Sequence, residues 1–163
     1  MNVSLADTST RGMTKKEANR MEVWREISTA WRMITRGAEK NLSPLGICTT
    51  EFKILRILEE DGPTPMARLS DAIALTQPAI TSFVDKLELQ GMVKRERNQD
   101  DRRVIRIAMT KKGQALLGQG MRLHSKFIDG LLSEISDSEL SKLSTIMKKI
   151  SIAKITIQNP TAS

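Results

Sequence analysis

The hydrophobic pattern of this chain changes period once, and that change constrains the fold more than any other feature. Up to about residue 90, apolar residues recur every three or four positions, which is typical of amphipathic helices. They then alternate with polar residues in two short runs, Met92–Arg97 and Val104–Met109, which predict two strands joined by a polar tip. After Thr110 the helical period returns. The pattern predicts a mainly α fold with a small β-hairpin.

Breaker and cap residues divide the chain before the hairpin into four helices. We expect these at 15–42, 49–61, 66–74 and 77–90. Thr64 is expected to cap the third helix with Pro65 at its first position, and Leu75–Thr76 to form a tight turn in which Thr76 caps the fourth. A short helix, a brief turn and a polar-faced helix fit helix-turn-helix geometry. The order therefore predicts a winged helix-turn-helix flanked by long terminal helices.

Two more helices are expected after the hairpin. Thr110 caps the first, which runs to about Ile135, and Ser136 with Glu139 forms a capping box for the second. The chain is thus expected to divide into a disordered tail (1–13), an N-terminal dimerisation helix (14–45), a winged helix-turn-helix DNA-binding region (46–113), C-terminal dimerisation helices (114–158) and a second tail (159–163).

Charge and composition narrow the function classes. The 163 residues carry a formal net charge of +7, which favours nucleic acid as a partner, although a basic balance alone is weak support. A single Cys and a single His exclude an internal disulfide and leave a zinc site short of ligands. No apolar run is long enough to cross a membrane and no secretory signal is visible, so we expect a cytoplasmic protein. No nucleophile–base pair or phosphate-binding glycine loop is visible, so neither an enzyme nor a cofactor is expected.

The positive charge is concentrated on the hairpin. Residues 92–113 contain eight cations and three acids, a net +5 within 22 residues. A ribbon with arginines at its tip can place a guanidinium in a minor groove, and Asp101 is expected to orient Arg103 through an ion pair. On the preceding helix, Gln77, Thr81, Ser82 and Lys86 lie opposite the apolar stripe and can reach base edges or phosphates. Solvated surfaces without a ligand are the alternative for both elements.

The stretch from Pro63 to Gly113 resembles the MarR family of winged-helix regulators. The resemblance is carried by Leu75–Thr81, by Val84–Glu88 running to Gly91–Arg95, and by Asp101-Arg102-Arg103 followed by Met109–Gly113. With its flanking helices it extends over about 15–155. It implies a homodimer that binds a pseudo-palindromic double-stranded DNA site, and a repressor that many members release on binding a small, often phenolic, ligand. The alternative is a winged-helix module that senses no ligand and either coats DNA without sequence preference or binds another protein.

The resemblance also assigns DNA contacts by position. It implies groove contacts on the recognition helix, a phosphate contact from Lys86, and a wing centred on Asp101 and Arg103. This chain departs from the family's pattern at Asn98, Asp100 and Pro78, and Pro78 removes one hydrogen bond to a base. The predicted contacts are Thr76, Gln77, Pro78, Thr81, Ser82 and Lys86 on the helix, and Arg97, Asp101, Arg102 and Arg103 on the wing.

The terminal segments are apolar enough to require a covering partner. Eight Leu, Ile and Met residues fall between Leu140 and Ile157, and Trp24 and Trp31 lie on one face of the first helix. We expect them to form the dimer interface; packing against the winged domain of the same chain is the alternative. The candidate ligand pocket comprises Trp31, Arg32 and Arg36, where an arginine could pair with a carboxylate. The alternative is that the apolar residues of this part of the first helix are ordinary core.

Cys48 is the remaining residue with reactive chemistry. It precedes a helix N-terminus, which could lower its thiol pKa. It does not match the first-helix cysteine of peroxide-sensing relatives, so a small, partly buried apolar residue is the other interpretation. Redox activity stays open at this point.

Overall fold

Helices dominate the computed structural model, which describes residues 13–97 and 105–152. The elements in chain order are α1 (Lys15–Leu42), η1 (Ser43–Leu45), α2 (Thr49–Asp61), β1 (Thr64–Pro65), α3 (Met66–Ile73), α4 (Gln77–Leu89), β2 (Val93–Arg97), β3 (Ile105–Met109), α5 (Lys111–Leu132) and α6 (Asp137–Ile152). They fall into two compact units that divide after Phe127. The expected mainly α fold with a β-hairpin is confirmed.

Several helix boundaries follow from local capping chemistry. The Thr14 hydroxyl accepts from the backbone N–H of Glu17 at the start of α1, and Glu17 bonds back to the Thr14 N–H. The predicted capping box of Ser136 and Glu139 starts α6 in the same way. Helix α5 ends at Leu132, three residues before the predicted end.

One predicted cap is wrong. Thr64 does not cap α3, because it pairs with Ile107 in a short strand, β1, and its hydroxyl donates to the Gly62 carbonyl at 2.9 Å. The residue before α3 is Pro65, which provides no side-chain cap. The sheet therefore has three antiparallel strands in the order β1-β3-β2, where the sequence predicts two.

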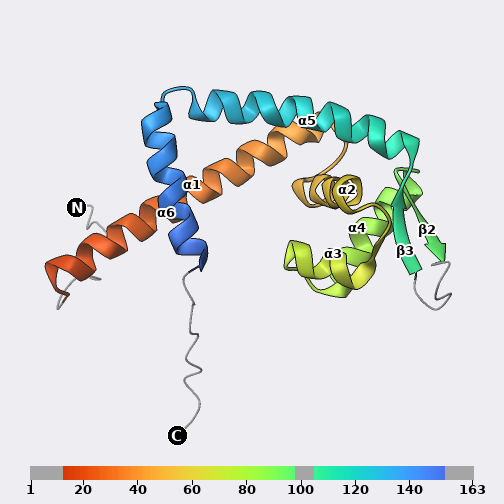
Figure 1. Ribbon diagram of the computed structural model, residues 1–163, viewed down its shortest axis with the longest axis horizontal. Helices are drawn as coiled ribbons and strands as arrows, with labels where there is room; N and C mark the ends of the chain where they lie inside the picture. The colour runs from red at the N-terminus through yellow and green to blue at the C-terminus, as the bar shows by residue number, and fades with distance from the viewer. Residues whose placement is uncertain (1–12, 98–104, 153–163) are drawn as a thin grey trace, which may run out of the picture. The chain divides into compact units, whose positions relative to one another are not determined.

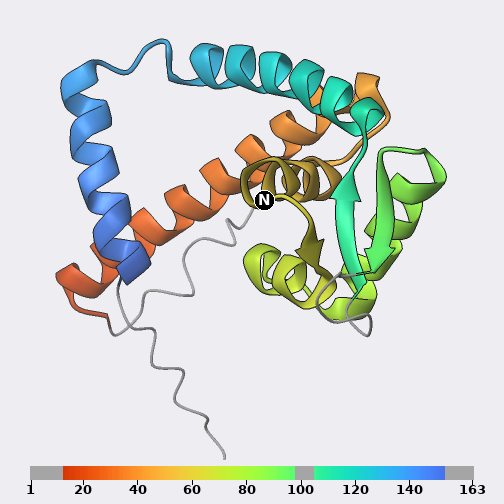
Figure 2. The same ribbon diagram turned by 45° about the vertical axis from the view of Figure 1, so that its right-hand side comes forward.

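An aliphatic core holds the helix-turn-helix against the sheet. Helices α2, α3 and α4 gather beside β2 and β3 in both views (Figures 1 and 2). Leu117 of α5 joins this core, and Gly120 lets α5 approach the ring of Phe52. The most deeply buried apolar side chains are Leu42, Ile54, Leu55, Leu69, Ile80, Val84, Leu87, Val93 and Ile107. Their burial fixes which face of α4 is left for a ligand.

Candidate nucleic-acid interface

Helix α4 presents its first turn to solvent. The chain reaches it through Ala74, which has a left-handed φ of 59° and ends α3, followed by Leu75, whose N–H bonds to the Ser70 carbonyl at 3.1 Å. Thr76 occupies the N-cap position as predicted, but its side chain makes no capping hydrogen bond among the described residues. Thr76, Gln77 and Pro78 are all exposed. This turn therefore has side-chain polar groups available for a partner.

Two predicted contact residues one turn further are engaged with their own helix. The Thr81 hydroxyl donates to the Gln77 carbonyl at 2.9 Å, and the Ser82 hydroxyl donates to the Pro78 carbonyl at 3.3 Å. Each hydroxyl oxygen still has lone pairs that can accept from a base amino group. As donors, both would first have to rotate away from the backbone.

Lys86 is tied to a buried carboxylate. Its Nζ lies 2.9 Å from Oε1 and 3.2 Å from Oε2 of Glu51, a fully buried residue of α2. The hydrogen bond to this carboxylate raises the pKa of Lys86 above its ordinary value. Glu51 also accepts from the backbone N–H of Cys48 at 2.8 Å and so caps α2. Lys86 thus helps to hold α4 against α2, a role that the sequence does not suggest.

Arg95 has a structural role that the sequence analysis missed. This residue of β2 forms ion pairs with two acids of α4, through Nη2 to Asp85 at 2.6 Å and through Nη1 to Glu88. The hydrogen bond to Asp85 is the main cause that raises the pKa of Arg95. The sequence does contain a hint of these ion pairs. Asp85 and Glu88 are three residues apart and so share one face of the helix, and Arg95 follows just after the turn that ends it.

The wing is described only at its root. Arg97 is exposed at the end of β2, opposite Ile105 in the register; Asp101, Arg102 and Arg103 lie outside the described residues. Lys94 pairs with Glu96 at 2.5 Å. Glu96 is already counted in the net +5. The partners of Arg95, Asp85 and Glu88, lie outside residues 92–113, so the net +5 overstates the charge that the hairpin has available for DNA.

The base of the hairpin is fastened to α5. As predicted, Thr110 caps α5, where its hydroxyl accepts from the N–H of Gly113 at 3.1 Å. The same hydroxyl donates to the Gly91 carbonyl at 2.7 Å, and the Thr110 N–H donates to the Met92 carbonyl at 3.0 Å. Lys112 adds a bond from its Nζ to the Gln90 carbonyl at 2.8 Å. These bonds fix the start of β2 to the first turn of α5.

A cavity of about 180 Å³ lies between α1, α2 and α5. Of the residues of the candidate ligand pocket, Trp31 lines this cavity, whereas Arg32 and Arg36 are exposed on α1 and do not line it. Its cationic groups come from α2 instead. The lining comprises Trp31, Ile34, Thr35, Ala38, Leu42, Thr49, Phe52, Lys53, Arg56 and His124.

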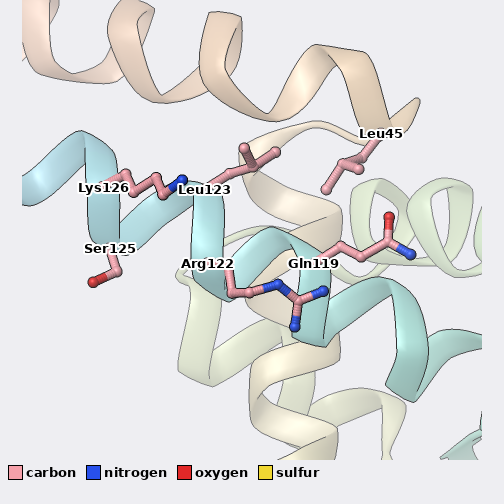
Figure 3. Close-up of a pocket in the computed structure, with 6 residues that line it drawn as sticks. All are labelled: Leu45, Gln119, Arg122, Leu123, Ser125 and Lys126. Carbon is pink, nitrogen blue, oxygen red and sulfur yellow. The ribbon is translucent and has the colours of Figure 1, made fainter.

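A second, more open hollow lies along α5. Its volume is about 500 Å³, and Leu45 and Leu123 point toward each other across it (Figure 3). Its cations are Arg122 and Lys126. It shares no residue with the cavity beside Trp31, so the two hollows can be tested separately.

Cys48 occupies the N-cap position of α2. Its Sγ accepts from the Glu51 N–H at 3.5 Å, and burial raises the pKa of the thiol. Any lowering by the helix N-terminus is outweighed here, because desolvation and the adjacent Glu51 carboxylate disfavour the thiolate. This environment favours the interpretation of Cys48 as a structural residue.

No set of side chains suited to a metal ion occurs in the described parts of the chain. Within the same ranges, no helix is sufficiently long and apolar to traverse a bilayer.

Comparison with known proteins gives a consistent result. The sequence profile of the MarR family matches residues 47–105. The chain is 31% identical over 140 residues to the HTH-type transcriptional regulator MhqR of Bacillus subtilis (strain 168), a match that covers 86% of this chain and 94% of that protein.

Solved structures share the fold. A mutant MarR from E. coli, in complex with operator DNA, superposes with a TM-score of 0.73 at 24% identity, covering 81% of this chain and 95% of that one. BpsR of Bordetella bronchiseptica, whose DNA binding is regulated by 6-hydroxynicotinic acid, gives 0.71 at 15% identity, covering 80% and 98%.

Proposed function

This chain belongs to the MarR family of DNA-binding transcriptional regulators, which are not enzymes, and from that premise we propose that it is a homodimeric repressor of a pseudo-palindromic operator. The observation that carries the proposal is the exposed first turn of α4, where Thr76, Gln77 and Pro78 project beyond a helix whose other face is buried. A helix presented in this way fits the major groove.

We assign contacts to each groove separately. The major groove is read or lined by Thr76, Gln77, Pro78, Thr81 and Ser82. Lys86 approaches a phosphate while its ion pair with Glu51 holds the helix. Arg97 and the Asp101–Arg103 tip reach the adjacent minor groove, where the potential is most negative.

Dimerisation is supported by apolar side chains on the terminal helices. Trp24 and Trp31 of α1 are 62% and 63% exposed, far more than large aromatic groups usually are in a soluble protein. On α6, the exposed residues Leu143, Ile146, Met147 and Ile150 form a second apolar stripe. We assign the interface to segments 14–45 and 114–158, which would place two copies of α4 roughly 34–36 Å apart along the duplex.

DNA footprinting of the gene's own upstream region tests this function. Purified protein should protect two half-sites about one helical turn apart and prefer that duplex to an unrelated one by at least roughly a thousandfold. Sedimentation of the free protein should give the mass of a dimer. Equal affinity for both duplexes would refute sequence-specific repression and support the alternative of a non-specific DNA-coating or protein-binding module.

We also propose that a small aromatic anion releases the repressor by binding beside Trp31. The cavity combines the flat groups of Trp31 and Phe52 with the cations Lys53 and Arg56, which suits a hydroxylated aromatic carboxylate. The regulation of BpsR by 6-hydroxynicotinic acid supports a ligand of this chemistry.

Three arginine variants separate the candidate ligand sites. Salicylate and 6-hydroxynicotinic acid serve as probes in a DNA-release titration. Arg56→Gln should raise the concentration needed for release, whereas Arg36→Gln and Arg122→Gln should not, because neither of those side chains lines this cavity. Loss of response only in Arg122→Gln would move the site to the hollow on α5.

A further inference from the structure

The contacts around Arg95 join the wing to the recognition helix. Its guanidinium lies between two acids of α4, donating from Nη2 to Asp85 at 2.6 Å and from Nη1 to Glu88. Its backbone N–H donates to the other oxygen of Glu88 at 3.1 Å. The Arg95 side chain is only 31% exposed. One residue of β2 therefore makes three bonds to α4, through both its side chain and its main chain.

The local charge balance argues against a phosphate contact from Arg95. One guanidinium faces two carboxylates, so the cluster formed by Asp85, Glu88 and Arg95 has a net charge of −1. One of the two N–H donors on each of Nη1 and Nη2 is already used, and a phosphate arriving there would meet two like charges. A different role has to explain why a cation is held here.

We propose that Arg95 is a positioning residue for DNA binding: it fixes the direction in which β2 leaves α4 and so sets where the wing meets the duplex. The inference rests on the proposed function, in which α4 and the wing enter neighbouring grooves. A rigid angle between them lowers the ordering cost of binding both at once. Without the clamp, β2 would be held to α4 mainly by the turn at Gly91 and by the buried side chain of Val93.

The decisive variant removes the acids and keeps the arginine. Asp85→Asn combined with Glu88→Gln removes two negative charges from the protein, so electrostatics alone predicts tighter DNA binding. Loss of the clamp predicts the opposite, a weakening of about tenfold for the footprinted operator duplex. Unchanged or tighter binding by this double variant would overturn the proposal. A far-UV circular dichroism spectrum that matches that of the wild type checks that the variant is folded.

A salt titration distinguishes positioning from contact. Arg95→Gln should weaken binding without changing the slope of log affinity against log salt, because no phosphate contact is lost. Arg97→Gln, the matched control two residues along the same strand, should lower the slope by about one unit. A comparable fall in slope for Arg95→Gln would make Arg95 a phosphate contact and refute the positioning role.

Hydrogen exchange in the free protein tests the clamp independently of DNA. The amides of β2 should exchange faster in the Asp85→Asn/Glu88→Gln variant than in the wild type, while those of α2 should not change. Faster exchange with undiminished operator affinity would show a clamp that does not position the wing, and would overturn the proposal. If the wild type lacks operator preference, the proposed function fails, and the affinity comparison on a random duplex still decides the role of Arg95.

Discussion

Replacing Gly113 by alanine should disrupt the attachment of the hairpin to α5. Gly113 is buried in the first turn of α5, where an added Cβ would lie 2.1 Å from the Met92 carbonyl oxygen and 2.9 Å from Cγ of Met109. Because Cβ atoms essentially never come within 3.0 Å of a heavy atom outside the two neighbouring residues of the chain, that carbonyl would have to retreat by about 0.9 Å.

The cost follows from what the Met92 carbonyl does. It accepts from the Thr110 N–H at 3.0 Å, and a retreat of this size breaks or strains that bond. The single proton of the Thr110 hydroxyl goes to the nearer Gly91 carbonyl at 2.7 Å. This hydrogen bond contributes about 1 kcal/mol, and overpacking costs about 1–3 kcal/mol. The higher helix propensity of alanine returns about 1 kcal/mol. We therefore expect Gly113→Ala to lower the free energy of unfolding by about 1–3 kcal/mol.

The same substitution elsewhere in α5 provides a matched control. An added Cβ at Gly118 meets nothing closer than Nη1 of Arg122 at 3.8 Å, so Gly118→Ala should stabilise the protein by about 0.5–1 kcal/mol. Urea unfolding is followed by circular dichroism at one fixed protein concentration, since a dimer's stability depends on it. With a slope of about 2 kcal/mol/M, the Gly113→Ala midpoint should fall by roughly 0.5–1.5 M. Equal midpoints for the two variants would refute the steric argument.

Three further outcomes are expected. Glu51→Ala should lower the free energy of unfolding by about 1–3 kcal/mol in urea denaturation, because the helix cap and the partner of Lys86 are both lost; an unchanged midpoint would contradict this. Cys48 should react with iodoacetamide more slowly than a free thiol at pH 8, since burial raises its pKa, and a faster reaction would show an activated thiolate. The hydrogen bonds from Ser136 lower the pKa of Glu139 below 4.5, so its support of α6 is complete above that pH and is lost as the pH falls through the lowered value. A carboxyl titration by NMR should show this low midpoint and its return toward 4.5 in Ser136→Ala.

The sequence predicted the elements well because their limits depend on local chemistry. Helix α1 runs over the expected 15–42, α2 over the expected 49–61, and Thr110 caps α5. Thr64 was assigned to the wrong element, since a threonine before a proline suits a helix cap as well as a strand, and only its pairing with Ile107 decides between them.

The site was harder to predict because ion pairs depend on how elements pack. Nothing near Lys86 in the chain shows that Glu51, 35 residues earlier, is buried beneath it. Likewise, Lys53 and Arg56 line the cavity beside Trp31 because α2 packs there, whereas Arg32 and Arg36 are its neighbours in sequence only. Periodicity indicates which face of a helix is buried, but it does not indicate which residue of another element meets that face.

The order of the strands has a consequence for behaviour in concentrated solution. Within the described sheet β3 is central, so β1 and β2 form its two edges. The edge at β1 is two residues long and includes Pro65, which has no N–H to offer an incoming strand. The edge at β2 consists of four consecutive charged residues, Lys94, Arg95, Glu96 and Arg97, which is unfavourable for pairing with another copy. Both edges therefore resist the addition of strands from neighbouring molecules, so association through the sheet into fibres or aggregates should be rare even at high protein concentration.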